Sequence, residues 1–174
     1  VGRFLDDFEN SLASFVGAKY AVACTSGTAA LHIGLQMLGV KAGDKVIVPA
    51  TTFISTINVI LYCQATPVLV DIDERTLNMD PAKLAEAIDD HTKVILPVHL
   101  YGQPCQMDKI MAIAESTGVD VLEDACESIG SRYKKKYTGT FGRISAFSFN
   151  GNKVVTCGGG GMIVTDDQEI AQQC

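Results

Sequence analysis

The sequence has no apolar run long enough to cross a membrane, and this absence removes one class of protein. Its longest apolar stretches are strand-sized, whereas a membrane-spanning helix needs about 20 consecutive apolar residues. It also has no basic stripe, because 14 lysines and arginines are scattered among 20 acidic residues and the net charge is −6. A nucleic-acid binder needs such a stripe to neutralise phosphates. We therefore expect a cytoplasmic protein without a membrane or nucleic-acid partner.

Metal-ligand spacing is absent as well. The six cysteines form no Cys-x-x-Cys pair, and the three histidines are scattered. Zinc ligands occur at short, regular spacings, so the sequence predicts no metal site and reduced, mostly buried thiols. It shows no internal repeat, low-complexity tract or interdomain linker. The 174 residues, 47% of them hydrophobic, therefore predict one domain with a substantial core.

Apolar, β-branched runs alternate with helical patterns along the chain, which is typical of a sheet with helices on both faces. We expect a three-layer α/β/α fold with a mostly parallel, seven-stranded sheet. The predicted strands are 20–24, 45–49, 66–71, 93–98, 119–123, 144–148 and 161–165. The predicted helices between them are 29–38, 53–63, 81–88 and 107–116. No helix separates the last two strands, so one of them is expected to run antiparallel.

Lys153 is the most informative residue of the chain. It lies between an apolar strand and the tetraglycine segment 158–161, where a neutral lysine amine can form a Schiff base with an aldehyde. An ordinary loop lysine is the alternative interpretation. Asp124 directly follows the predicted buried strand 119–123, at the sheet edge where α/β proteins bind ligands. An acid that can pair with a pyridinium nitrogen, together with this lysine, suggests pyridoxal phosphate.

Thr25-Ser-Gly-Thr28 follows the first strand and opens a helix, so its free N–H groups offer a cradle for a phosphate. Serine and threonine are also ordinary helix N-caps, which is the alternative interpretation. A dinucleotide site is a weaker explanation, because Gly-x-Gly-x-x-Gly is absent from this turn and the tetraglycine precedes a strand. A Walker lysine is missing too.

Four segments, taken in order, resemble the DegT/DnrJ/StrS-type sugar aminotransferases over roughly residues 8–167. They are Thr25-Ser-Gly-Thr-Ala-Ala-Leu31, Pro49-Ala-Thr-Thr-Phe53, Glu123-Asp-Ala-Cys-Glu-Ser-Ile-Gly130 and Ser148-Phe-Asn-Gly-Asn-Lys153. The resemblance implies a fold-type-I, pyridoxal-phosphate-dependent enzyme of the aspartate aminotransferase type. It also implies that residues 1–174 form the large cofactor-binding domain of a longer chain that acts as a homodimer, with a C-terminal small domain outside this sequence.

The resemblance also assigns roles to residues. Lys153 matches the catalytic lysine that bonds to the cofactor aldehyde, and Asp124 matches the acid that keeps the pyridine nitrogen protonated. Ser148 matches a hydroxyl donor to the cofactor phosphate, and Gly27 with Thr28 matches the helix-terminus part of the phosphate cradle. These five residues are the first part of the predicted cofactor site.

Two further matches and one departure complete this comparison. Phe53 matches the aromatic residue that stacks on the pyridine ring, although a plain core position is the alternative. Glu127 lies where relatives carry His or Gln near the ring hydroxyl of the cofactor. Gly159 stands where many relatives carry glutamate, and this change leaves the substrate subgroup open.

The resemblance implies transfer of an amino group from L-glutamate to a nucleotide-linked keto sugar, for amino sugars of bacterial surface polysaccharides. One alternative is the sugar dehydratase branch of the family, whose members carry histidine in place of the lysine, so Lys153 argues against it. Another is a non-catalytic sensor or assembly protein of the same fold. The sequence does not exclude this second alternative.

Overall fold

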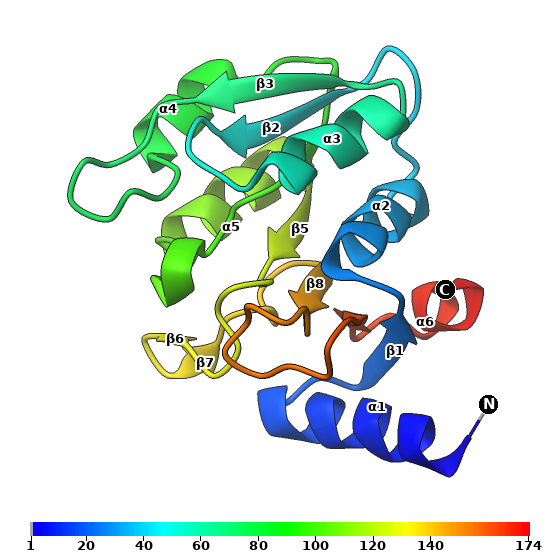
Figure 1. Ribbon diagram of the computed structural model, residues 1–174. Coiled ribbons are helices and arrows are strands. Elements are labelled where there is room, and N and C mark those ends of the chain that lie inside the picture. Colours follow the sequence, from blue (N-terminus) through cyan, green and yellow to red (C-terminus); the bar gives the residue numbers. More distant parts are fainter. Residues whose placement is uncertain (1) are drawn as a thin grey trace.

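The computed structural model describes residues 2–174 and has a seven-stranded sheet at its centre (Figure 1). The strands follow the spatial order β1-β9-β8-β5-β4-β2-β3. Their bounds are β1 (Tyr20–Cys24), β2 (Lys45–Pro49), β3 (Thr66–Val70), β4 (Thr92–Ile95), β5 (Asp120–Asp124), β8 (Ile144–Ser148) and β9 (Gly161–Thr165). β9 pairs antiparallel with both β1 and β8, and every other neighbouring pair is parallel. The expected antiparallel strand is confirmed.

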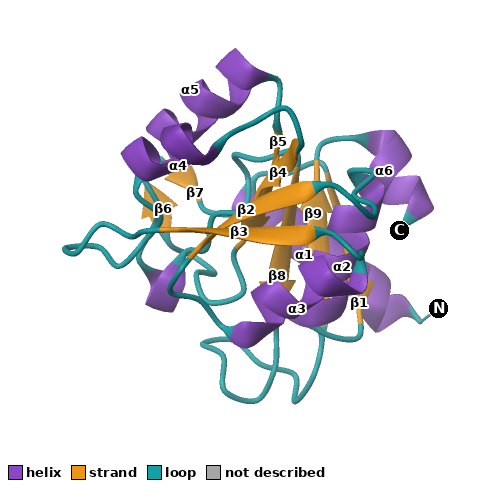
Figure 2. Ribbon diagram, turned by 90° about the horizontal axis from the view of Figure 1, so that it is seen from above, coloured by secondary structure: helices purple, strands orange, loops and turns teal. Residues whose placement is uncertain are grey.

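Helices cover both faces of this sheet, as the alternation of side chains along the strands requires. They are α1 (Arg3–Val16), α2 (Gly27–Met37), α3 (Ile54–Tyr62), α4 (Pro81–Ala87), α5 (Met107–Thr117) and α6 (Gln168–Gln173). Leu122 packs in the core under α2 and α3, whereas its neighbour Val121 packs in the core under α4 and α5. Figure 2 shows α4 and α5 on one side of the strands and α2 and α3 on the other. The predicted three-layer fold class is confirmed.

Element ends differ from the predicted ones for local reasons. β4 stops at Ile95 instead of continuing to Val98, because Pro97 has no N–H to donate to a neighbouring strand. α2 begins at Gly27, two residues earlier than predicted, with Ser26 as its N-cap. The short hairpin of β6 (Arg132–Tyr133) and β7 (Lys136–Tyr137) and the 3₁₀ turn η1 (Leu100–Gly102) were not predicted. Elements of two or three residues are too short to show a periodic pattern.

The topology collects chemically useful residues at one edge of the sheet. β1, β5 and β8 run in the same direction, so their carboxyl ends lie together. Asp124 ends β5, Ser148 ends β8, and Gly27 opens the helix that follows β1. Ligands of open α/β sheets bind at this edge. Within residues 2–174, no helix has the length and apolar character needed to span a bilayer.

Candidate active site

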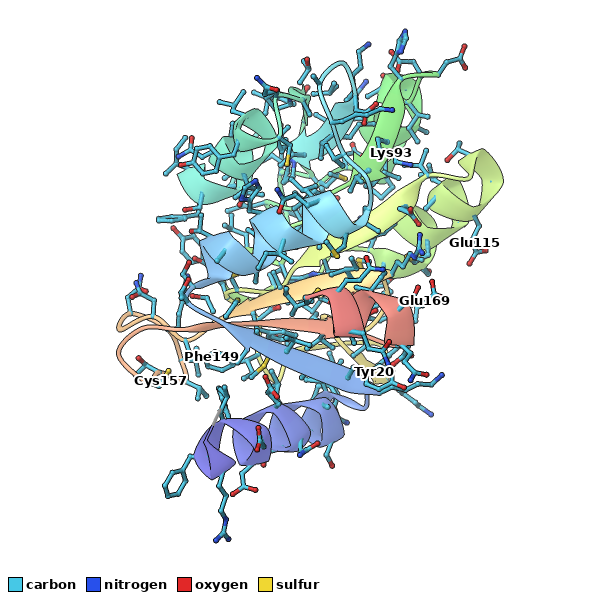
Figure 3. The ribbon with its side chains drawn as sticks, turned by 90° about the vertical axis from the view of Figure 1, so that its right-hand side faces the viewer. Tyr20, Lys93, Glu115, Phe149, Cys157 and Glu169 are labelled. Carbon is cyan, nitrogen blue, oxygen red and sulfur yellow. The ribbon has the colours of Figure 1, made fainter. Side chains whose placement is uncertain are left out.

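A cavity of about 250 Å³ opens at this edge of the sheet. All seven site residues chosen from the sequence line it, namely Gly27, Thr28, Phe53, Asp124, Glu127, Ser148 and Lys153. The loop between β8 and β9, which carries Lys153, forms one wall. Figure 3 shows Phe149 and Cys157 of this loop at the end of the molecule where β1 finishes, with Tyr20 at the opposite end of that strand. The structure therefore brings together segments that are far apart in the sequence.

The start of α2 is built to hold an anion. The side chain of Ser26 accepts a hydrogen bond from the N–H of Ala29 at 3.1 Å, which leaves earlier N–H groups of the helix for a ligand. A Cβ atom on Gly27 would lie 2.7 Å from Sγ of Cys126 and 2.8 Å from Cβ of Ser148. Glycine is thus required for the end of β8 to approach the helix, and this approach sets the hydroxyl of Ser148 beside the helix N-terminus. A phosphate fits these donors.

Lys153 is held inside the cavity by one carboxylate and one aromatic ring. Its Nζ lies 3.3 Å from Oε1 of Glu127, and the side chain of Lys153 is 14% exposed. The other carboxylate oxygen of Glu127 accepts the N–H of Tyr101 at 2.9 Å, which fixes the carboxylate in place. The ring of Phe53 lies 5.8 Å from the same Nζ. The amine is therefore oriented, accessible from the cavity and screened on one side by an apolar face.

Asp124 presents a fixed carboxylate to the cavity. The residue is 5% exposed; its Oδ1 accepts the N–H of Cys126 at 3.1 Å, and its Oδ2 accepts the hydroxyl of Thr56 at 2.8 Å. A buried carboxylate beside a cavity favours a cationic group in a ligand, such as a protonated pyridine nitrogen. Burial and the nearby Asp124 carboxylate raise the pKa of the Cys126 thiol well above its ordinary value. Cys126 is consequently a neutral thiol.

Sequence reasoning missed several residues that line the cavity. Thr56, Leu100 and Asn152 are examples. Thr56 lies three residues after Phe53, the N-cap of α3, so helical periodicity places both side chains near the start of this helix, and this was the available signal. Leu100 belongs to the 3₁₀ turn η1, for which the sequence offered no periodic pattern.

The DegT/DnrJ/EryC1/StrS aminotransferase family model matches residues 1–174. The chain belongs to this family. The resemblance found in the four sequence segments is thereby confirmed. Membership covers the whole given chain, including the cavity and the loop that carries Lys153.

Curated proteins and solved structures are similar to the chain over nearly its whole length. GDP-perosamine synthase of Caulobacter vibrioides is 50% identical over 98% of the chain, which covers 46% of that relative. A crystal structure of an aminotransferase from Psychrobacter cryohalolentis superposes with a TM-score of 0.97 at 42% identity, over 99% of this chain and 44% of that one. The crystal structure of NtdA from Bacillus subtilis, solved with bound cofactor PMP, superposes with a TM-score of 0.93 at 42% identity. The match covers 100% of this chain and 39% of NtdA. The chain spans about half the length of the curated relatives it matches.

Gly161, where β9 begins, is expected to be intolerant of any side chain. A Cβ atom there would lie 2.2 Å from the carbonyl oxygen and 2.3 Å from the carbonyl carbon of Ser26. These are backbone atoms of the anion cradle, so Gly161→Ala should lower the free energy of unfolding by about 1–3 kcal/mol, as overpacking does. Urea unfolding measures this loss.

The matched control for this substitution is Gly159→Ala in the same loop. A Cβ atom on Gly159 meets no atom within 4 Å, so we expect a change below about 0.5 kcal/mol. Equal unfolding midpoints for the two variants would contradict the packing argument.

Proposed function

We propose that the full-length protein containing this chain is a pyridoxal-phosphate-dependent aminotransferase that transfers an amino group from L-glutamate to a nucleotide-linked keto sugar. The observation that carries the proposal is the joint placement of Lys153 and Asp124 on one cavity, with an anion cradle beside them. Family membership and the names of relatives such as GDP-perosamine synthase support the substrate class.

The residues of the cavity fit this cofactor by chemistry. The N-terminus of α2 and the hydroxyl of Ser148 would hold its phosphate, and Asp124 would pair with the nitrogen of its ring. The cofactor supplies an aldehyde that carries the amine between the two substrates and a ring that takes up the electrons of the broken Cα–H bond. Phe53 would cover one face of that ring and exclude water from it.

Lys153 performs the proton transfers in this proposal. Its amine reaches the cavity from the side of Phe53 and Glu127. As a free amine it removes the proton from the donor Cα and later returns a proton to the sugar carbon. Glu127 holds the lysine side chain in position between these steps, and the N–H of Tyr101 fixes the Glu127 carboxylate, which would be a polar partner for the cofactor.

The same proposal includes the organisation of the whole protein. Residues 1–174 act as the large cofactor-binding domain, a C-terminal small domain completes the sugar pocket, and the active form is a cytoplasmic homodimer. A sugar dehydratase is disfavoured because Lys153 carries a primary amine where that branch has histidine. A non-catalytic sensor of this fold would bind the cofactor without transferring an amine.

The decisive test labels the lysine. The full-length protein is mixed with pyridoxal phosphate and reduced with borohydride, and peptide mapping by mass spectrometry locates the adduct. We expect one cofactor on Lys153, with glutamate protecting against the labelling because it removes the aldehyde. Labelling of other lysines alone would contradict the proposed site, and labelling without amine transfer from glutamate would favour the sensor.

A further inference from the structure

Two hydroxyl groups form a hydrogen-bond chain that ends at the carboxylate of Asp124. Thr52 Oγ1 donates to Thr56 Oγ1 at 2.9 Å, and Thr56 Oγ1 donates to Asp124 Oδ2 at 2.8 Å. Thr56 is fully buried, whereas Thr52 is partly exposed. A hydroxyl has a single hydrogen. The carboxylate of Asp124 can only accept, so the hydrogen of Thr56 is directed to it, and Thr56 Oγ1 is left to accept the hydroxyl of Thr52.

The carboxylate of Asp124 accepts hydrogen bonds from two different parts of the fold. The N–H of Cys126, two residues after the end of β5, donates to Oδ1 at 3.1 Å, and Thr56 of α3 donates to Oδ2. With one donor on each oxygen, rotation of the carboxylate about its Cβ–Cγ bond is restricted. The lone pairs that remain are free to meet a ligand, since Asp124 lines the cavity.

Thr56 also belongs to the turn that presents Phe53. Phe53 is the N-cap residue of α3, and the N–H of Thr56 donates to the carbonyl oxygen of Phe53 at 3.0 Å. The side chain of Phe53 remains exposed and lines the cavity. Thr56 therefore hydrogen-bonds both to the backbone of Phe53 and to the carboxylate of Asp124.

We propose that Thr56 is a positioning residue, which acts through Asp124, and that Thr52 stabilises the Thr56 hydroxyl in this orientation by donating a hydrogen bond to it. The inference rests on the proposed function, because it requires that Asp124 pairs with the ring nitrogen of bound pyridoxal phosphate. Loss of the hydroxyl frees the carboxylate to rotate and leaves the ring nitrogen of the cofactor with a less well placed partner. Cofactor affinity and ring orientation then change together.

The experiment uses the full-length protein with pyridoxal phosphate as the probe. Two quantities are measured: the dissociation constant of the cofactor, and the visible circular dichroism of the bound cofactor, which reports a fixed ring orientation. The variants are Thr56→Val, Thr56→Ser and Thr52→Val, with Thr165→Val as a control. Thr56→Val should bind about tenfold more weakly, the order expected for loss of a hydrogen bond to a charged group, and its visible dichroism should be reduced. Thr56→Ser should restore both quantities. Thr52→Val should bind about threefold more weakly, because it removes only the hydrogen bond to Thr56 and leaves the one to Asp124.

Thr165→Val is the matched control. Thr165 is 4% exposed and donates its hydroxyl to the carbonyl oxygen of Arg143 at 2.8 Å, at the opposite end of the sheet from the cavity. It should lose stability without changing the dissociation constant or the dichroism. Wild-type values in Thr56→Val would overturn the inference while leaving the proposed function intact, and so would wild-type values in Thr52→Val if the first variant does not fold. Failure of the wild-type protein to bind the cofactor would instead refute the proposed function.

Discussion

Replacing Lys153 by alanine is expected to lower the rate of amine transfer by roughly 10⁴-fold or more, the range reported for loss of a general base or a nucleophile. The amine of Lys153 is the cavity's candidate for carrying a proton between donor, cofactor and acceptor. Steady-state transfer from L-glutamate to a nucleotide-linked keto sugar, measured on the full-length protein, checks the loss. The variant should remain folded, because Lys153 lies in a loop and its salt bridge with Glu127 is partly exposed.

Two controls separate chemistry from structure in this variant. Lys153→Arg keeps a positive charge beside Glu127, but a guanidinium is not deprotonated in proteins, so it should be as inactive as the alanine variant. A small primary amine added to Lys153→Ala should restore part of the activity, because it can carry the missing proton. Appreciable transfer by Lys153→Ala without added amine would show that another group performs this step.

Replacing Glu123 by alanine is expected to have the largest effect on stability, a loss of about 3–5 kcal/mol in the free energy of unfolding. Glu123 is fully buried beside Asp124 in β5. Its carboxylate accepts hydrogen bonds from four donors at 2.6–2.9 Å, which are the backbone N–H groups of Gly139, Phe141 and Gly142 and Nε2 of His99. All four donors would lose their partner, and the loss is a large part of the 5–15 kcal/mol typical of a folded protein.

The tautomer of His99 explains why glutamine is also a poor substitute at Glu123. The N–H of Cys105 donates to Nδ1 of His99 at 3.1 Å, so Nε2 carries the ring proton and donates to Glu123. An amide NH₂ group placed at either oxygen position of Glu123 would face hydrogen-bond donors. We expect Glu123→Gln to lose about 2–3 kcal/mol, less than the alanine variant because one oxygen acceptor remains.

Urea unfolding measures both Glu123 variants, with Glu86→Ala as the control. Glu86 pairs with Lys83 on the surface, with side chains 66% and 46% exposed, so its loss should change stability by less than about 0.5 kcal/mol. A Glu123→Ala variant as stable as the control would show that the buried network contributes little. The backbone N–H of His99 also donates to the carbonyl oxygen of Asp124. His99 therefore stabilises both the side chain of Glu123 and the backbone of Asp124.

Much of this molecule was predictable from its sequence. Four strand ranges agree with the structure at both ends, for example 144–148, because buried strands appear as short β-branched runs bounded by turn residues. The antiparallel strand was predictable from the length of one connection. The segment between strands 144–148 and 161–165, which contains Lys153, is too short for a parallel crossover. The residues expected at the site line one cavity, although their roles in binding and catalysis stay predictions.

The sequence by itself determined the seven strands of the sheet, the helices between them and the side chains at the carboxyl ends of the strands, because these properties depend on neighbours within a few residues. Only the tertiary structure decided how Thr56 meets Asp124, 68 residues away in the chain, and how Glu123 collects donors from His99 and from the loop at 139–142. Such contacts depend on the directions of individual hydrogen bonds between distant segments. Hydrophobic periodicity carries no information about those directions, and only the packed sheet and its helices set them.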